Sequence, residues 1–96
     1  MKRLQNERMA QTQQTFSNKK DGPIYISVEP WPEYFELEPG DKLTLKWDAD
    51  DSGDAMQIDF INERELAVWP NGKIDDIGYF FNGDPGEDRS WTFKHR

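Results

Sequence analysis

The 96-residue chain has a formal net charge of −7 and no cysteine, and 34% of its residues are hydrophobic and 14% aromatic. This length is typical of a single domain, and the aromatic content is too high for a fully disordered chain. The composition excludes disulfides and thiol chemistry, and the negative charge disfavours nucleic acid as a ligand because it repels phosphate backbones.

Residues 1–22 differ from the rest of the chain in charge and in hydrophobic pattern. They hold five Lys or Arg and two Asp or Glu, a balance of +3, and the remaining residues hold seven and seventeen, a balance of −10. Their few apolar residues, such as Leu4 and Met9, form no periodic stripe. We therefore expect a flexible basic and polar tail over 1–22, with at most a fraying helix over 3–13, followed by a folded domain over 23–96.

No segment of the chain has the pattern of a targeting or membrane signal. The first residues are basic but lack the apolar stretch of a signal peptide, and no apolar run is long enough to span a bilayer. A secreted domain of this size would commonly carry disulfides. We therefore expect a cytoplasmic protein without a membrane partner.

After Asp21-Gly22-Pro23 the hydrophobic pattern changes to a period of two residues, which is typical of strands with one buried face. Groups of Gly, Pro, Asn and Asp interrupt this pattern at short intervals and predict turns. The expected strands are 24–28, 34–37, 42–47, 56–60, 66–69, 77–81 and 90–94. This pattern predicts an all-β fold, an antiparallel β-sandwich of about seven short strands with a polar N-terminal tail.

Several turns are defined by the conformational preferences of their residues. Glu38-Pro39-Gly40-Asp41 has Pro at the second position and Gly at the third, where a positive φ is needed. Asn71-Gly72, which follows Pro70, favours a hairpin between its two flanking strands. Asn82-Gly83 begins a further turn, and 48–54 is predicted to be a loop.

The segment 35–47, Phe-Glu-Leu-Glu-Pro-Gly-Asp-Lys-Leu-Thr-Leu-Lys-Trp, resembles the two strands joined by a Pro-Gly-Asp turn in cupredoxin-like and immunoglobulin-like sandwiches. The resemblance covers about 13 of the 96 residues and implies the β-sandwich fold. Cupredoxins bind copper through two His, one Cys and a weak axial ligand. This chain has no Cys and a single His, His95, so the resemblance does not extend to a copper site.

The chain lacks the residue patterns of catalytic sites. His95, its only histidine, lies next to the C-terminus, and its serines are not part of a recognisable nucleophile motif. The abundant carboxylates suit paired-acid chemistry by residue type, but a chain this small leaves little room for a substrate cleft. Solvated strand faces explain these carboxylates better, and we expect a protein that is not an enzyme.

The segment 48–59 contains the pattern of a calcium-binding loop. It has acidic or hydroxyl side chains at the first, third and fifth positions, Gly at the sixth and an acid at the twelfth. Predicted strands flank it in place of helices, and Asp, Ser and Gly are also the ordinary residues of a solvated hairpin tip, which is the alternative. No other cofactor is expected. The candidate calcium ligands are Asp48, Asp50, Ser52, Asp54 and Asp59.

A second candidate site consists of aromatic residues that lie outside the apolar phase of the strands. Trp47 and Trp91 are in phase with the predicted core. Exposed rigid rings are typical of protein-binding hot spots and of platforms that stack on sugars. Alternatively, a second layer of structure or the tail covers these rings. The aromatic residues on the opposite phase or beside prolines are Tyr25, Trp31, Tyr34, Trp69 and Phe80.

These observations favour a small, acidic, non-enzymatic binding module that engages a protein partner through exposed aromatic residues and acidic loops. An acidic body suits a basic partner. One alternative is a carbohydrate-binding module in which Trp31, Tyr34 and Trp69 stack on sugar rings. The other is a β domain that binds calcium weakly. We expect a monomer or a weak homodimer, since exposed edge strands can pair with a second copy.

Overall fold

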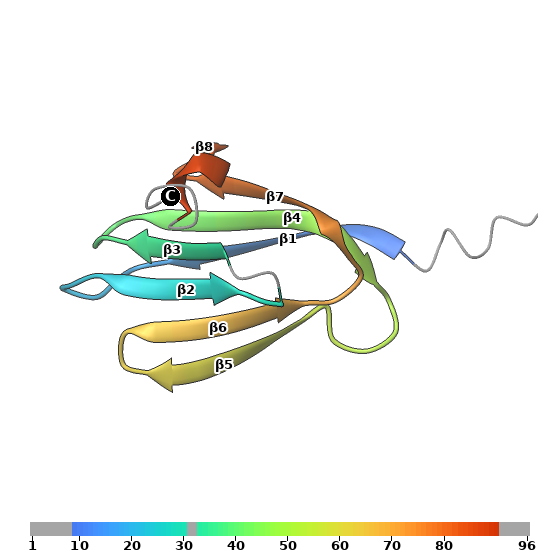
Figure 1. Ribbon diagram of the computed structural model, residues 1–96, viewed down its shortest axis with the longest axis horizontal. Helices are drawn as coiled ribbons and strands as arrows, with labels where there is room; N and C mark the ends of the chain where they lie inside the picture. Colours follow the sequence, from blue (N-terminus) through green and yellow to red (C-terminus); the bar gives the residue numbers. More distant parts are fainter. Residues whose placement is uncertain (1–8, 31–32, 91–96) are drawn as a thin grey trace, which may run out of the picture.

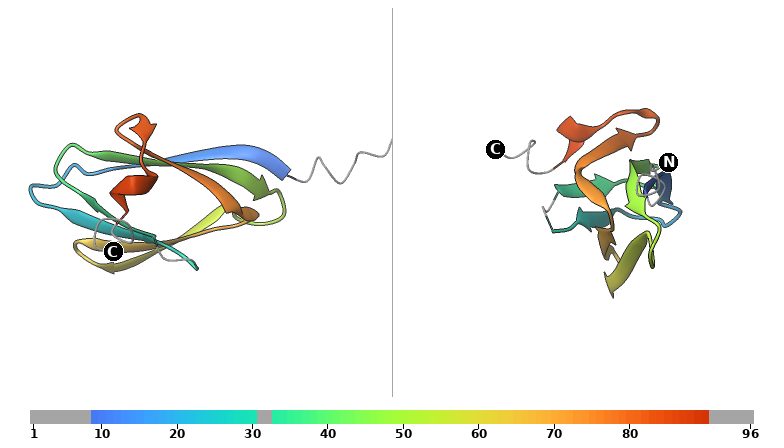
Figure 2. Two further views of the ribbon diagram at one scale, coloured as in Figure 1. Left: turned by 45° about the horizontal axis from the view of Figure 1, so that its top comes forward. Right: turned by 90° about the vertical axis from the view of Figure 1, so that its right-hand side faces the viewer.

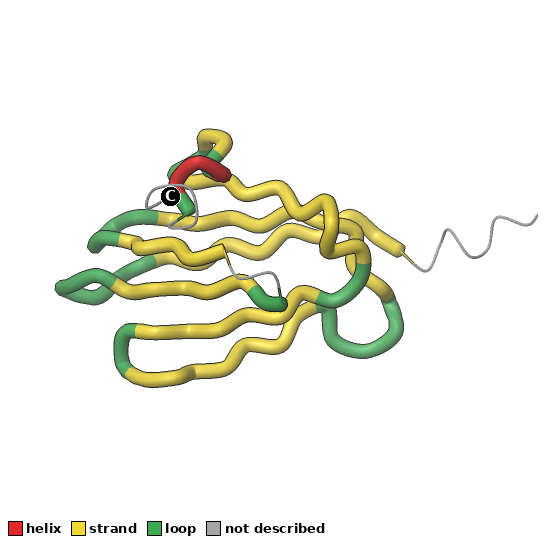
Figure 3. Tube along the Cα trace, in the orientation of Figure 1, coloured by secondary structure: helices red, strands yellow, loops and turns green. Residues whose placement is uncertain are grey.

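Two four-stranded sheets form in the computed structural model of the chain, which describes residues 9–30 and 33–90. They pack as a β-sandwich, and turns and loops join the strands (Figures 1 and 3). A short 3₁₀ turn, η2 (Glu87–Arg89), follows the last strand. The strands are β1 (Met9–Ser17), β2 (Ile24–Val28), β3 (Glu33–Leu37), β4 (Lys42–Asp50), β5 (Met56–Asn62), β6 (Glu65–Pro70), β7 (Lys73–Phe81) and β8 (Asp84–Pro85).

Sheet A has the strand order β1-β4-β7-β8, and sheet B has the order β3-β2-β6-β5. The paired strands are antiparallel except β2 and β6, which run parallel. The predicted all-β sandwich is confirmed, and the strand expected at 90–94 lies outside the described residues except for Ser90. No helix in the described part of the chain has the length and hydropathy needed to cross a membrane.

Apolar residues at alternate positions of both sheets fill the space between them. In β4, the side chains of Leu43, Leu45 and Trp47 are buried in this interior. The indole Nε1 of Trp47 donates a hydrogen bond to the carbonyl oxygen of Asn71 at 2.8 Å, so burial leaves this polar group satisfied. The core residues are Phe16, Ile24, Ile26, Val28, Phe35, Leu37, Leu43, Leu45, Trp47, Ala49, Val68, Ile77 and Phe81.

The sandwich begins earlier in the chain than the hydrophobic pattern predicts. Strand β1 lies at the edge of sheet A and pairs with β4 along its whole length. The prediction of a tail over 1–22 is therefore wrong for β1, and the prediction of a fraying helix is wrong for 9–13. An edge strand needs few apolar residues, because the hydrogen bonds to its neighbour hold the backbone. In β1, Phe16 supplies the buried side chain.

The Asn71-Gly72 turn does not form the predicted hairpin. Because β6 belongs to sheet B and β7 to sheet A, this turn carries the chain from one sheet to the other. Gly72 has a φ of 115° and lies against the backbone of β4, where an added Cβ would collide with the carbonyl oxygen of Asp48. Glycine is therefore required for a close approach of two chain segments. A hairpin forms instead at Asn82-Gly83, where both residues have positive φ values between β7 and β8.

Candidate functional site

Sheet B presents one face to the core and the other to solvent. On β3 and β6, more buried side chains alternate with more exposed ones on the outer face, and on β2 Tyr25 is the exposed side chain of that face. The strand register arranges the outer side chains in rows that cross the sheet. The first row is Tyr34, Ser27, Ala67 and Asp59, and the second row is Glu36, Tyr25 and Glu65.

Three aromatic side chains protrude from this outer surface, which we call the aromatic face and define by Tyr25, Tyr34 and Trp69. Their exposed fractions are 37%, 45% and 42%, respectively. Ser27, which is buried, and the half-buried Ala67 occupy the middle of the face between these rings. The face therefore presents three large rings that remain accessible to a partner.

Hydrogen bonds fix the indole ring at one side of the aromatic face. The Nε1 of Trp69 donates to Oδ2 of Asp59 at 3.2 Å, and the Nε2 of Gln57 donates to Oδ1 of the same carboxylate at 3.0 Å. Gln57 is also the register partner of Trp69 between β5 and β6. A ring held in this way loses little conformational freedom when a partner binds it.

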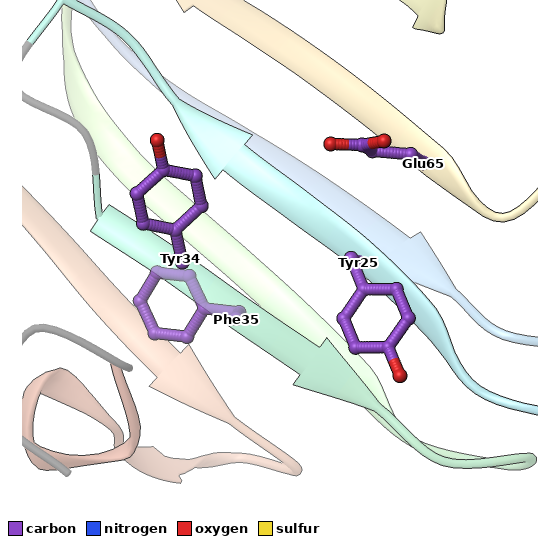
Figure 4. A pocket seen from close by; sticks show the side chains of 4 residues that line it. All are labelled: Tyr25, Tyr34, Phe35 and Glu65. Carbon is purple, nitrogen blue, oxygen red and sulfur yellow. The ribbon is translucent and has the colours of Figure 1, made fainter. Parts of the chain in front are cut away.

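A small hollow lies on the opposite side of the face, where β3, β2 and β6 meet (Figure 4). Its volume is about 170 Å³, and Tyr25, Tyr34, Phe35 and Glu65 line it. The carboxylate of Glu65 extends from β6 toward the space beside the two tyrosines. Aromatic rings and a carboxylate are therefore the groups that any occupant of this hollow would meet.

The charge of sheet B has a single sign. Its four strands contain no Lys, Arg or His, and they contain the acidic residues Glu33, Glu36, Asp59 and Glu65. Sheet A differs, because β4 and β7 contain lysines as well as aspartates. The aromatic face therefore lies on the sheet whose strands carry only negative charge.

The structure gathers three of the five predicted aromatic site residues and separates a fourth from them. Phe80 lies on β7 in sheet A, where the Nζ of Lys46 covers its ring at 4.7 Å from the centroid. Trp31 lies outside the described residues. The predicted patch is thus reduced to Tyr25, Tyr34 and Trp69, which all lie on sheet B.

The candidate calcium ligands are not gathered into one site. Asp48 and Asp50 belong to the end of β4, and Oδ1 of Asp50 accepts hydrogen bonds from the backbone nitrogen and the hydroxyl of Ser52. Asp54 lies in the following loop, and Asp59 lies on β5, where Trp69 and Gln57 engage its carboxylate. Among residues 9–30 and 33–90, no three acidic or His side chains are arranged to hold a metal ion.

Glu65 belongs to the aromatic face but was not among the predicted site residues. The period of two in β6 places Glu65, Ala67 and Trp69 on the same side of the strand, and this signal is present in the sequence. The neighbours of Glu65 could not be inferred in the same way. Its proximity to Tyr25 depends on the parallel pairing of β2 with β6, which joins segments about 40 residues apart.

Comparisons with protein-family models, with curated proteins and with solved structures found no match to this chain.

Proposed function

We propose that this protein is a non-enzymatic binding module that engages a basic protein partner through the aromatic face. One observation carries the proposal: three exposed aromatic rings share the outer face of a sheet whose strands contain four acidic residues and no basic residue. Large rings supply most of the binding free energy at many protein interfaces, and complementary charge directs the approach of the partner.

One ring of the aromatic face is already held in place before a partner binds. The indole of Trp69 donates a hydrogen bond to Asp59. A ring held in this way favours association because less side-chain freedom is lost on binding.

We also propose that the sandwich belongs with the cupredoxin-like and immunoglobulin-like architectures, without a copper site. The turn Glu38-Pro39-Gly40-Asp41 supports this, because it connects β3 of sheet B with β4 of sheet A and is closed by the backbone nitrogen of Asp41, which donates to the carbonyl oxygen of Glu38 at 2.9 Å. Gly40 has the positive φ, 91°, that such a turn requires.

The decisive experiment places a positive charge at the centre of the aromatic face. The full chain and its Ala67→Lys variant are immobilised, proteins are captured from a lysate of the source organism, and the dissociation constant of the recovered partner is measured with purified protein. The matched control is Gln13→Lys, which makes the same charge change on an exposed residue of β1 in sheet A.

We expect Ala67→Lys to weaken binding by about tenfold or more, because it adds both bulk and like charge where the partner docks. Gln13→Lys should change the dissociation constant by about twofold or less, and binding should weaken as salt is raised. Equal binding by both variants would refute the aromatic face as the docking surface. Binding of the chain to glycans, with a change in tryptophan fluorescence and without a protein partner, would establish the carbohydrate alternative instead.

A further inference from the structure

The hollow on the aromatic face is lined by two phenol rings, the ring of Phe35 and one carboxylate. Tyr25 on β2 and Tyr34 on β3 lie at diagonal positions of the register, and Glu65 on β6 is the register partner of Tyr25. Figure 4 shows the carboxylate of Glu65 extending from one side, with the rings of Tyr25 and Tyr34 on neighbouring strands. The three side chains come from three neighbouring strands and line the same hollow.

Glu65 has no cationic partner within the described part of the chain. Its Oε1 accepts a hydrogen bond from the neutral amide Nδ2 of Asn62 at 3.1 Å, which orients the carboxylate without changing its charge. The ion pair that the described residues do form, between Arg64 and Asp21 at 3.4 Å, does not involve it. An ionised carboxylate has about four lone-pair sites, so most of the hydrogen-bonding capacity of Glu65 is left for a ligand.

The chemistry of this lining selects for one kind of ligand group. Faces of phenol rings attract cations through their quadrupole, and an adjacent carboxylate adds a full negative charge. An anionic group would be repelled by Glu65, and a purely apolar group would bury that carboxylate without a partner. A cation with an apolar stem satisfies both the rings and the carboxylate.

We propose that this hollow receives one cationic side chain, a lysine ammonium or an arginine guanidinium, of the basic partner; this inference rests on the function proposed for the aromatic face. The volume of about 170 Å³ leaves room for the head of a long basic side chain. Tyr25, Tyr34 and Glu65 form the cation site, and Trp69 lies outside it.

The three tyrosines of the chain allow a direct test by NMR. Full-length protein with ¹³C-labelled tyrosine is titrated with Gly-Ser peptides that contain a single central Lys, Arg or Gln, up to millimolar concentrations. The Lys and Arg peptides should shift the ring signals of Tyr25 and Tyr34, and the Gln peptide should not. Tyr79 lies on β7 of the other sheet and does not line the hollow, so its ring signals should shift less than those of Tyr25 and Tyr34.

Matched variants distinguish the effect of a residue that lines the hollow from the effect of the negative charge of the face as a whole. Glu65→Gln should raise the dissociation constant of the Lys peptide by about three- to fivefold, and Tyr34→Leu should do so by about threefold. Glu36→Gln removes the same charge on the other side of Tyr25, outside the hollow, and should change the constant by about 1.5-fold or less. Tyr34→Phe retains the ring and should bind the Lys peptide nearly as well as the unchanged protein.

The remaining outcomes distinguish failure of the cation site from failure of the proposed docking surface. Equal weakening by Glu65→Gln and Glu36→Gln, equal shifts with the Gln peptide, or no shift with any peptide would overturn the cation site. If the cation site fails but Ala67→Lys still abolishes capture of the partner, the proposed function stands without it. If the Lys peptide binds as expected but Ala67→Lys leaves capture unchanged, the cation site stands and the proposed docking surface fails.

Discussion

Asn18 joins three segments of the chain from a position that is almost completely buried, at 1% exposure. Its Nδ2 donates to the carbonyl oxygens of Gly22 and Leu37 at 2.9 and 2.8 Å, and its Oδ1 accepts from the backbone nitrogen of Lys20 at 2.9 Å. Its backbone also bonds to Gly40 and Asp41 in the next turn. A single polar residue thus ties the β1–β2 connection to the end of β3 and the turn after it.

Replacing this amide by a carboxylate should destabilise the fold. Asn18→Asp keeps the shape but places an oxygen against the carbonyl groups of Gly22 and Leu37, so both bonds are lost and a charge is buried. We expect the free energy of unfolding to fall by about 2–4 kcal/mol, measured by urea denaturation. Gln11→Glu, which also replaces an amide by a carboxylate but at an exposed position of β1, should lower the free energy of unfolding by less than about 0.5 kcal/mol. A similar loss of unfolding free energy in both variants would contradict the conclusion that the hydrogen bonds of Asn18 stabilise the fold.

Tyr79 should make the stability of the protein sensitive to alkaline pH. Burial, together with the negative charges of Glu33 and Glu87, raises the pKa of Tyr79 from 10.0 to about 12. Between these values the unfolded chain loses the phenol proton and the folded chain keeps it, so the free energy of unfolding falls as the pH rises. The contribution of this one group is at most about 1.4 kcal/mol per pH unit.

The variant Tyr79→Phe removes this proton and keeps the ring that packs against Phe35 at a centroid distance of 5.2 Å. Urea denaturation at a series of pH values between 10 and 12 should therefore show a shallower fall for the variant than for the unchanged protein. Identical slopes would show that Tyr79 does not titrate differently in the folded and unfolded states.

At the scale of single elements, deletion of β1 tests whether this strand belongs to the fold. It supplies the outer neighbour of β4 and the buried ring of Phe16. Deletion of residues 1–17 should abolish the cooperative thermal transition, because it exposes the edge of β4 and part of the core. Deletion of 1–8 retains every β1–β4 pair and should preserve the transition. Cooperative melting of the shorter chain, followed by circular dichroism, would contradict the position of β1.

Strand β5 is the edge strand of sheet B and lies at the periphery of the molecule (Figure 2). Phe60 on this strand is 80% exposed, and Val68 on the neighbouring β6 is 0% exposed. Phe60→Thr should therefore change the free energy of unfolding by less than about 0.5 kcal/mol, and Val68→Thr should lower it by about 1–3 kcal/mol. Chemical denaturation of both variants measures the difference, and a larger loss at Phe60 would mean that β5 is covered.

The elements also show where the pattern of residues predicts structure and where it does not. The strand with strict alternation, β4, is confirmed because it has a buried face and an outer face. Strand β1 has little alternation: Thr12 and Gln14 share the phase of Phe16 but only Phe16 is buried. At a sheet edge the backbone hydrogen bonds are sufficient to hold such a strand, and these bonds leave no mark in the sequence.

At the scale of the whole molecule, the net charge of −7 should oppose compaction. Raising NaCl from about 0.02 to about 0.5 M shortens the Debye length and screens this repulsion, which should increase the free energy of unfolding by roughly 0.5–1 kcal/mol. Asp51→Lys, in an exposed loop, reduces the net charge and should show a smaller salt effect. A decrease in stability with added salt would mean that attractive ion pairs outweigh the repulsion.

The sequence by itself determined the fold class, most of the strands and the negative charge, because alternation, turn residues and composition are local or additive properties. It also placed Tyr25, Tyr34 and Trp69 outside the apolar phase. Only the tertiary structure decided that these three residues share one face. It also decided that Phe80 lies apart from the aromatic face and that Asp59 lies apart from the other candidate calcium ligands. The reason is that strand order and register join distant segments through backbone hydrogen bonds, and such pairings are not encoded in any short stretch of residues.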